Sequence, residues 1–474
     1  MPRDESSKPQ GGELRVDLNG ASAAVVGAQA GIDPSVGRGL ATRLGAAIAQ
    51  LEDERMAGHL PFLDVAQRKD ALAATRATAD ALRPGTDTLV VLGGGGAARG
   101  VSALAAALAD HPRRGREGAV GLVVLDSLDP AEVDRVLSQV DLERTAFHVI
   151  SAGGSEPDTM AQFLVVRDRL IRKFGALDYT RRLLVTTDAG EGGLRQLVRE
   201  EGLPASEFPS GLRERFAALC PELLLGSEMM GVDNDALLAG AAAMQERVLR
   251  REVLENPAAM LAGALYLLEV LHGGVVHMLM PWAARLWGMA NWWSQLWAAS
   301  LGKRFEEDGT QVALGPTPVR GTGASEHSSQ LQMLLDGPAD KVVLFVRTLD
   351  HGMDAQLPKA LPGFPEAAPL AGRGLGELLD AHQLAAEVGL ARRGRPSVRI
   401  DLPALTPHSM GELMLLLETS VVILARLHGV DPFSSPAAAT VQQRALALLG
   451  GPGAEDARAE VDAWRRGREG RWIL

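Results

Sequence analysis

The sequence is short of the residue types on which several classes of protein depend. It contains one cysteine, Cys220, among 474 residues, so it can form neither an internal disulfide framework nor a cysteine-built metal site. Its 48 Lys and Arg residues face 59 Asp and Glu residues, which gives a formal net charge of -11. A surface that follows nucleic-acid phosphates needs clustered cations instead. We therefore expect no nucleic-acid partner and a cytoplasmic location.

Long uninterrupted apolar runs are also missing. The longest apolar stretch, residues 257–301, is broken by charged residues, histidines, glycines and a proline, which makes it a poor membrane span. The first residues, "MPRDESSKPQGGELR", lack the apolar core of a secretory signal. We expect no membrane partner and interpret residues 1–45 as an N-terminal arm that is partly disordered.

The sequence does contain strand-like runs that alternate with helix-like runs. Apolar runs at 87–93, 121–130, 146–154 and 181–188 are each followed by a segment with apolar residues at helical spacing. A strand followed by a crossover helix, repeated four times, indicates a doubly wound parallel sheet. We expect this α/β domain to cover residues 46–235.

A second pattern of the same kind begins at about residue 236. An apolar helical block and a tryptophan-rich stretch precede two further strand-like runs, "DKVVLFVRTLD" (340–350) and "PSVRIDLPAL" (396–405). We expect a second α/β domain over residues 236–474, ending in a helical segment. The crowded tryptophans favour core packing over a sugar platform; they are Trp282, Trp287, Trp292, Trp293 and Trp297.

Two of the predicted strands end in small residues, "GGGGAARG" (93–100) and "SAGGSEPDT" (151–159). Ligands of doubly wound sheets lie beyond the carboxyl ends of the strands, where backbone N–H groups and a helix N-terminus can bind an anion. Glycines at such a turn can also do no more than make room for a closely packed helix. The spacing alone leaves both explanations open.

Taken together, the two turns resemble the glucose-6-phosphate isomerase family. "VVLGGGGAARG" is similar to the family's G-I-G-G-S-x-x-G turn, and "VISAGGSEPDT" is similar to S-K-S-G-T/S-T-x-E-T. The likeness continues in family order over roughly residues 60–445, through "QLWAASLGK", "GASEHSSQLQ" and "GVDPFSSP". It implies an α/β fold of two sugar-isomerase (SIS) domains, each a doubly wound, mainly parallel sheet in a three-layer α/β/α sandwich.

The resemblance also implies an activity, the aldose–ketose isomerisation of glucose 6-phosphate and fructose 6-phosphate. In that reaction a glutamate moves a proton through an enediolate, a histidine opens the ring and an arginine stabilises charge. No metal or other cofactor takes part. The implied partners are a sugar phosphate or related metabolite and a second copy of the chain in a homodimer.

Carried over position by position, the family's substrate and catalytic residues are only partly present. The matching substrate-binding positions are Gly95, Gly96, Ser151, Ser155 and Gln295, and the family arginine is Arg215. The family histidine falls on Ser328, while His327 stands one residue earlier and is the candidate substitute. These seven residues form the predicted site.

The other family residues are replaced. The proton-transferring glutamate falls on Ala299, whose methyl group cannot abstract a proton, and a threonine of the second turn falls on Glu156. A carboxylate at that place puts like charges together and disfavours a phosphate dianion. The remaining replacements are Ala97 and Ala217 for serines, Ala152 for a lysine, Gly153 for a serine, Arg213 and Glu214 for glycines, and Ser435 and Gln442 for a glutamine and a lysine.

Three hypotheses follow, so the sequence leaves open whether the chain is an enzyme. The first is an isomerase of the family with weak or rearranged activity, in which His327 and either Glu156 or Glu326 take over the proton chemistry. The second is a non-catalytic protein that binds a metabolite or regulates a competent subunit. The third is an isomerase or lyase acting on an unphosphorylated or cationic substrate.

Overall fold

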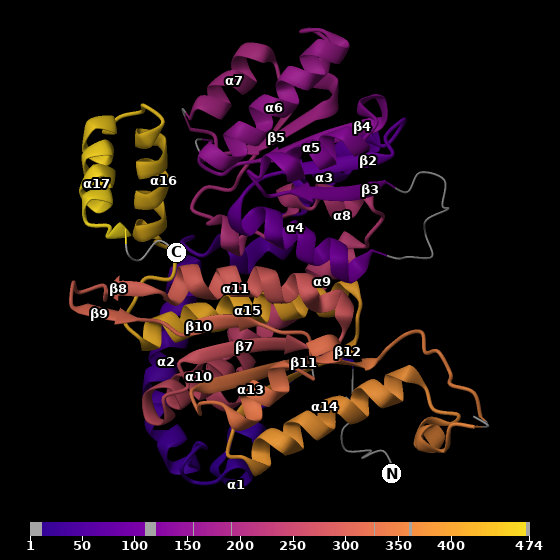
Figure 1. Ribbon diagram of the computed structural model, residues 1–474, viewed down its shortest axis with the longest axis vertical. Coiled ribbons are helices and arrows are strands. Elements are labelled where there is room, and N and C mark those ends of the chain that lie inside the picture. The colour runs from indigo at the N-terminus through magenta and orange to yellow at the C-terminus, as the bar shows by residue number, and fades with distance from the viewer. Residues whose placement is uncertain are drawn as a thin grey trace.

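The computed structural model describes residues 12–109, 120–154, 156–190, 192–326, 328–359 and 363–470, and contains two five-stranded sheets (Figure 1). The first sheet is parallel throughout, in the order β3-β2-β4-β5-β6. Its strands are β2 (Thr88–Leu92), β3 (Gly121–Leu125), β4 (Thr145–Ile150), β5 (Leu183–Thr187) and β6 (Ala205–Glu207). The four predicted strands of the first domain are confirmed.

Helices cover both faces of the first sheet, because its central strands bury both their faces. Val90 and Leu92 of β2 pack into a core with the helices on one side, whereas Leu89 and Val91 pack into the central core of the molecule. The helices that follow strands β2 to β5 are α4 (Gly95–Leu108), α5 (Pro130–Gln139), α6 (Pro157–Phe174) and α7 (Gly193–Glu201). The result is the expected three-layer α/β/α domain.

The second sheet has the order β1-β12-β11-β7-β10 and is parallel except for β1. Its strands are β1 (Arg15–Asp17), β7 (Val276–Pro281), β10 (Thr317–Arg320), β11 (Lys341–Asp350) and β12 (Ser397–Ala404). Interpreting residues 276–281 as part of a helical and tryptophan-rich stretch was wrong. Their sequence "VHMLMP" has little β propensity, and it becomes a strand because it pairs with β10 and β11 in the buried centre of the sheet.

Part of the predicted N-terminal arm belongs to this sheet. β1 runs antiparallel to β12, and α2 (Pro34–Met56) buries Leu44, Ile48 and Leu51 in the central core. Residues 15–17 and 34–45 are therefore structural elements, because they complete a sheet edge and a core. Residues 1–11 of the arm lie outside the described residues.

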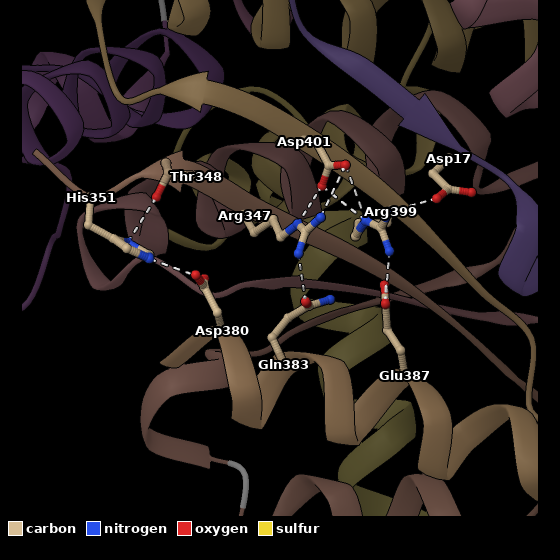
Figure 2. A network of polar contacts seen from close by, with 9 residues as sticks. All are labelled: Asp17, Arg347, Thr348, His351, Asp380, Gln383, Glu387, Arg399 and Asp401. Carbon is tan, nitrogen blue, oxygen red and sulfur yellow. Dashed lines mark hydrogen bonds and ion pairs between the residues drawn. The ribbon is translucent and has the colours of Figure 1, made fainter. Parts of the chain in front are cut away.

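Ion pairs hold β1 in place (Figure 2). Arg399 of β12 contacts Asp17 of β1 at 2.7 Å and Glu387 at 2.9 Å, and its Nε donates to Asp401 at 3.0 Å. Arg347 of β11 donates to the same Asp401 at 2.6 Å. Figure 2 shows these side chains pointing toward one another from three strands and α14 (Leu375–Arg392), so the network ties the sheet edge to its covering helix.

The two sheets share the central core, which is built from long helices (Figure 1). α15 is buried almost along its length, and α11 lies between it and the first sheet. Trp292, Trp293 and Trp297 of α11 are fully buried, as core packing predicted, while Trp287 is 38 % exposed and was wrongly assigned to the core. The main helices here are α9 (Asn234–Val248), α10 (Pro257–His272), α11 (Trp287–Leu301) and α15 (Pro407–Leu427).

The remaining elements are short or peripheral. A hairpin of β8 (Lys303–Phe305) and β9 (Gln311–Leu314) follows α11, and α16 (Pro436–Leu448) pairs with α17 (Ala454–Arg466) at one side of the molecule (Figure 1). Within the described part of the chain, no helix is long and apolar enough to cross a membrane. The other α-helices are α1 (Ala23–Val26), α3 (Lys69–Leu82), α8 (Leu225–Met229), α12 (Gly323–Glu326) and α13 (Gln330–Asp336).

A buried histidine makes the first domain sensitive to acid. His148 of β4 is fully buried beside Thr186, at 2.7 Å, and burial lowers its pKa from 6.5 to about 3. The unfolded chain therefore binds a proton below pH 6.5 that the folded chain does not, and stability falls as pH falls. As the pH falls from 7 to 5, the unfolding free energy of the wild type should decrease by about 2 kcal/mol more than that of His148→Gln.

Urea unfolding at pH 7 and at pH 5, monitored by a spectroscopic signal from the first domain, measures this difference. His59→Gln, which changes an exposed histidine, is the control and should follow the wild type. Equal losses in the wild type and in His148→Gln would contradict the assignment.

Candidate active site

The first glycine turn (residues 93–97) joins β2 to α4. Gly95 has φ +66, a backbone conformation that residues other than glycine rarely adopt. A Cβ on Gly96 would lie 2.3 Å from Cα of Arg215, in the short 3-10 helix η7 (Glu214–Phe216). Close packing of backbones therefore explains Gly96, and the same contact brings Glu214 and Arg215 to the N-terminus of α4.

The second glycine turn (residues 151–156) joins β4 to α6 and lies beside the first, because β2 and β4 are neighbouring parallel strands. The Gly94 N–H of the first turn donates to Thr159 Oγ1 of α6 at 3.1 Å. Within the second turn, the Gly153 N–H donates to Glu156 Oε1 at 3.1 Å, and the buried Ser151 hydroxyl donates to Glu156 Oε2. The carboxylate of Glu156 thus takes two of the donors that the turn offers to an anion.

Glu214 reaches the same turn from the other side. The Ala152 N–H donates to Glu214 Oε1 at 3.0 Å. Glu214 Oε2 and Gln295 Nε2 lie 3.3 and 3.2 Å from the position that a Cβ on Gly95 would take, so both flank the first turn. Burial raises the pKa of Glu214 to about 7, and the charge of Glu156 adds to the rise. This carboxyl is close to half-protonated at neutral pH.

Arg215 and Lys303 turn toward backbone carbonyls. Arg215 Nε donates to Ser300 Oγ at 3.1 Å, and its NH2 donates to the Pro432 carbonyl at 2.6 Å. Lys303 Nζ donates to the Ala299 carbonyl at 2.9 Å and to the Ser434 carbonyl. Burial lowers the pKa of Arg215 to about 10 and, with the help of Arg215, that of Lys303 to about 8. Both cations anchor the loop before α16.

The tertiary structure brings five of the seven predicted site residues into one cluster: Gly95, Gly96, Ser151, Arg215 and Gln295. Ser155 and His327 lie outside the described residues, so their roles stay predictions. Ala299 follows Gln295 by four residues on α11, which places both on one face of the helix.

Like Glu156, Glu214 belongs to this cluster but was left out of the predicted site by sequence reasoning. The signal in the sequence was that Glu214 aligns with a glycine of the family motif, so a long side chain enters the site at this position. Among the described residues, no group of three or more His, Cys, Asp or Glu side chains could hold a metal ion.

The raised pKa of Glu214 has a measurable effect on stability. The folded-state pKa of Glu214, about 7, exceeds the ordinary 4.5, so the folded chain binds this proton more tightly than the unfolded chain. The resulting stability is fully present below pH 4.5 and is lost as the pH rises through 7. As the pH rises from 5.5 to 8, the unfolding free energy of the wild type should therefore decrease by about 2 kcal/mol more than that of Glu214→Gln. Urea unfolding measures it, with Glu246→Gln, at a glutamate outside the cluster, as the control.

Two three-layer α/β/α domains around a shared helical core, with the two glycine turns at the carboxyl ends of β2 and β4, define a two-domain sugar-isomerase (SIS) protein. The model of the family described as phosphoglucose isomerase matches residues 77–339. "Glucose-6-phosphate isomerase" of Carboxydothermus hydrogenoformans is 34% identical over 85% of this chain and 86% of its own length.

Two further proteins are similar over almost the whole chain. "Probable glucose-6-phosphate isomerase" of Haloarcula marismortui is 34% identical over 96% of this chain and 99% of its own. The crystal structure of a hypothetical protein from Thermus thermophilus superposes with a TM-score of 0.81 at 30% identity, over 92% of this chain and 100% of its own. The chain belongs to the glucose-6-phosphate isomerase family.

Proposed function

We propose that this chain binds a sugar phosphate or a related small metabolite at the cluster around the two glycine turns, and that its turnover as a glucose-6-phosphate isomerase is weak or lost. The names of the similar proteins support the sugar-phosphate class. The retained Arg215 and Gln295 support binding at the family site. The proposal further includes catalytic roles for Arg215 and His327, a homodimer, and a cytoplasmic location.

One observation carries the proposed loss of turnover. Ala299 stands where the family's proton-transferring glutamate is expected, and its carbonyl accepts hydrogen bonds from Lys303 and from the Ser435 hydroxyl, at 2.9 and 3.4 Å. A positioned general base contributes about 10²- to 10⁴-fold to a rate. An alanine supplies none of this, whatever the rest of the site retains.

The test is a coupled assay in both directions, from glucose 6-phosphate and from fructose 6-phosphate, with a family enzyme that keeps the glutamate as the standard. We expect a kcat at least about 100-fold below that standard. Ligand binding is followed separately by thermal shift. Turnover at the standard's rate would contradict the proposal, and a shift without turnover would support the non-catalytic, metabolite-binding alternative.

A further inference from the structure

Three hydrogen-bond donors of the second glycine turn already have carboxyl partners within the chain. We propose that Glu156, assisted by Glu214, is a built-in anion that fills the phosphate site, so that the ligand of this site is an unphosphorylated sugar or sugar-derived polyol. This inference rests on the proposed function, because it assumes that the same cluster binds the ligand.

The first step of the argument is the number of donors. The Ser151 hydroxyl and the Gly153 N–H both donate to Glu156, and the Ala152 N–H between them donates to Glu214 at 3.0 Å. Three consecutive residues therefore each donate a hydrogen bond to one of two glutamate side chains. An incoming phosphate would have to displace both carboxylates to obtain the same bonds.

The second step concerns the helix termini. Glu156 is the N-cap residue of α6, yet its side chain makes no capping bond and bends back to the turn instead. The 14-residue α4 begins at Gly95, beside Glu214 Oε2. Helix N-termini favour negative charge. Here Glu156 and the ionised fraction of Glu214 supply that charge, and a dianion added beside them meets like charges.

The third step is what the site still offers. Carboxylate oxygens accept bonds from sugar hydroxyls, and Glu214 Oε2 and Gln295 Nε2 both flank Gly95, 3.3 and 3.2 Å from the position of its absent Cβ. Gln295 Oε1 is buried and has no hydrogen-bond partner. A neutral polyol can donate to this oxygen and to the carboxylates without bringing a charge, whereas a phosphate group can do so only where it is protonated.

Calorimetric titration of the full chain with glucose 6-phosphate, inorganic phosphate and glucose tests the proposal. In the wild type, glucose 6-phosphate should bind no more tightly than glucose, and inorganic phosphate should give no signal. Glu156→Thr, which frees two donors and removes a charge, should tighten glucose 6-phosphate binding about tenfold or more and leave glucose within a few-fold.

Two further variants make the result specific. Glu156→Gln keeps the length of the side chain but removes the charge, and it should give an intermediate gain even if Glu156→Thr folds poorly. Asp158→Asn removes a charge from the exposed first turn of the same helix and should behave as the wild type.

Wild-type binding of glucose 6-phosphate far tighter than of glucose, or no gain in either Glu156 variant, would overturn the inference. The proposed function and this inference fail on different results. Rapid wild-type turnover of glucose 6-phosphate would sink both, whereas slow turnover together with glucose 6-phosphate binding far tighter than glucose binding would sink this inference and leave the proposed function standing.

Discussion

Gly96→Ala should lower the unfolding free energy by about 3 kcal/mol, the upper part of the range for an overpacked buried site. A Cβ at this position would lie 2.3 Å from Cα and 2.5 Å from N of Arg215, and backbone atoms cannot rotate away as a flexible side chain can. α4 and η7 must separate, and Arg215 must move with η7. Thermal and urea unfolding measure the loss.

A matched control distinguishes this clash from the general effect of losing a glycine. Gly45 lies within α2, and a Cβ there would meet nothing within 4 Å. Gly45→Ala should stabilise the chain by up to about 1 kcal/mol, because alanine favours helix. If both variants behaved alike, the close approach of α4 to η7 would not explain Gly96.

The second large effect is expected on the rate of isomerisation, when a glutamate is placed at position 299 and Glu156 no longer occupies the phosphate site. In the Glu156→Thr background, Ala299→Glu should raise glucose 6-phosphate isomerisation by about 100-fold or more over Glu156→Thr alone. Ala299 shares a helix face with Gln295, and its carbonyl already lies beside Lys303, so a carboxylate there enters the cluster. The coupled assay measures the gain in kcat.

The control for the graft is Ala299→Gln in the same background, which adds a side chain of the same size but no base. It should give no gain. A graft no faster than this control would show that the cluster does not present the substrate to position 299, and would argue against the family site as the ligand site.

Much of the candidate site could be predicted from the sequence, because family motifs keep their order and spacing. The tertiary structure brings Gly95, Ser151 and Gln295 together, as their places in those motifs imply. Ala299 and Glu156 were identified as departures by the same alignment. The conformation of a side chain is not written in such a motif, so the direction of Glu156, back into its own turn, required coordinates.

The fold divides in the same way. The apolar runs of β2, β4 and β11 determined their strands by themselves, since a short apolar run bounded by turn residues suits a buried parallel strand. In β12 the signal was the alternation of Val398, Ile400 and Leu402 with charged residues. "VHMLMP" at 276–281 and "RVD" at 15–17 carry no such local signal. They become strands only because a neighbouring strand offers its unpaired edge.

The sequence by itself determined the family, the two α/β domains and the absence of a glutamate at position 299, because each depends on residue identity and order. Only the tertiary structure decided that Glu156 and Glu214 meet at one turn and take its donors. These residues are far apart in the sequence, and their meeting depends on η7 packing against α4 across the small surface of Gly96. Long-range packing of this kind leaves no periodicity in the chain from which it could be read.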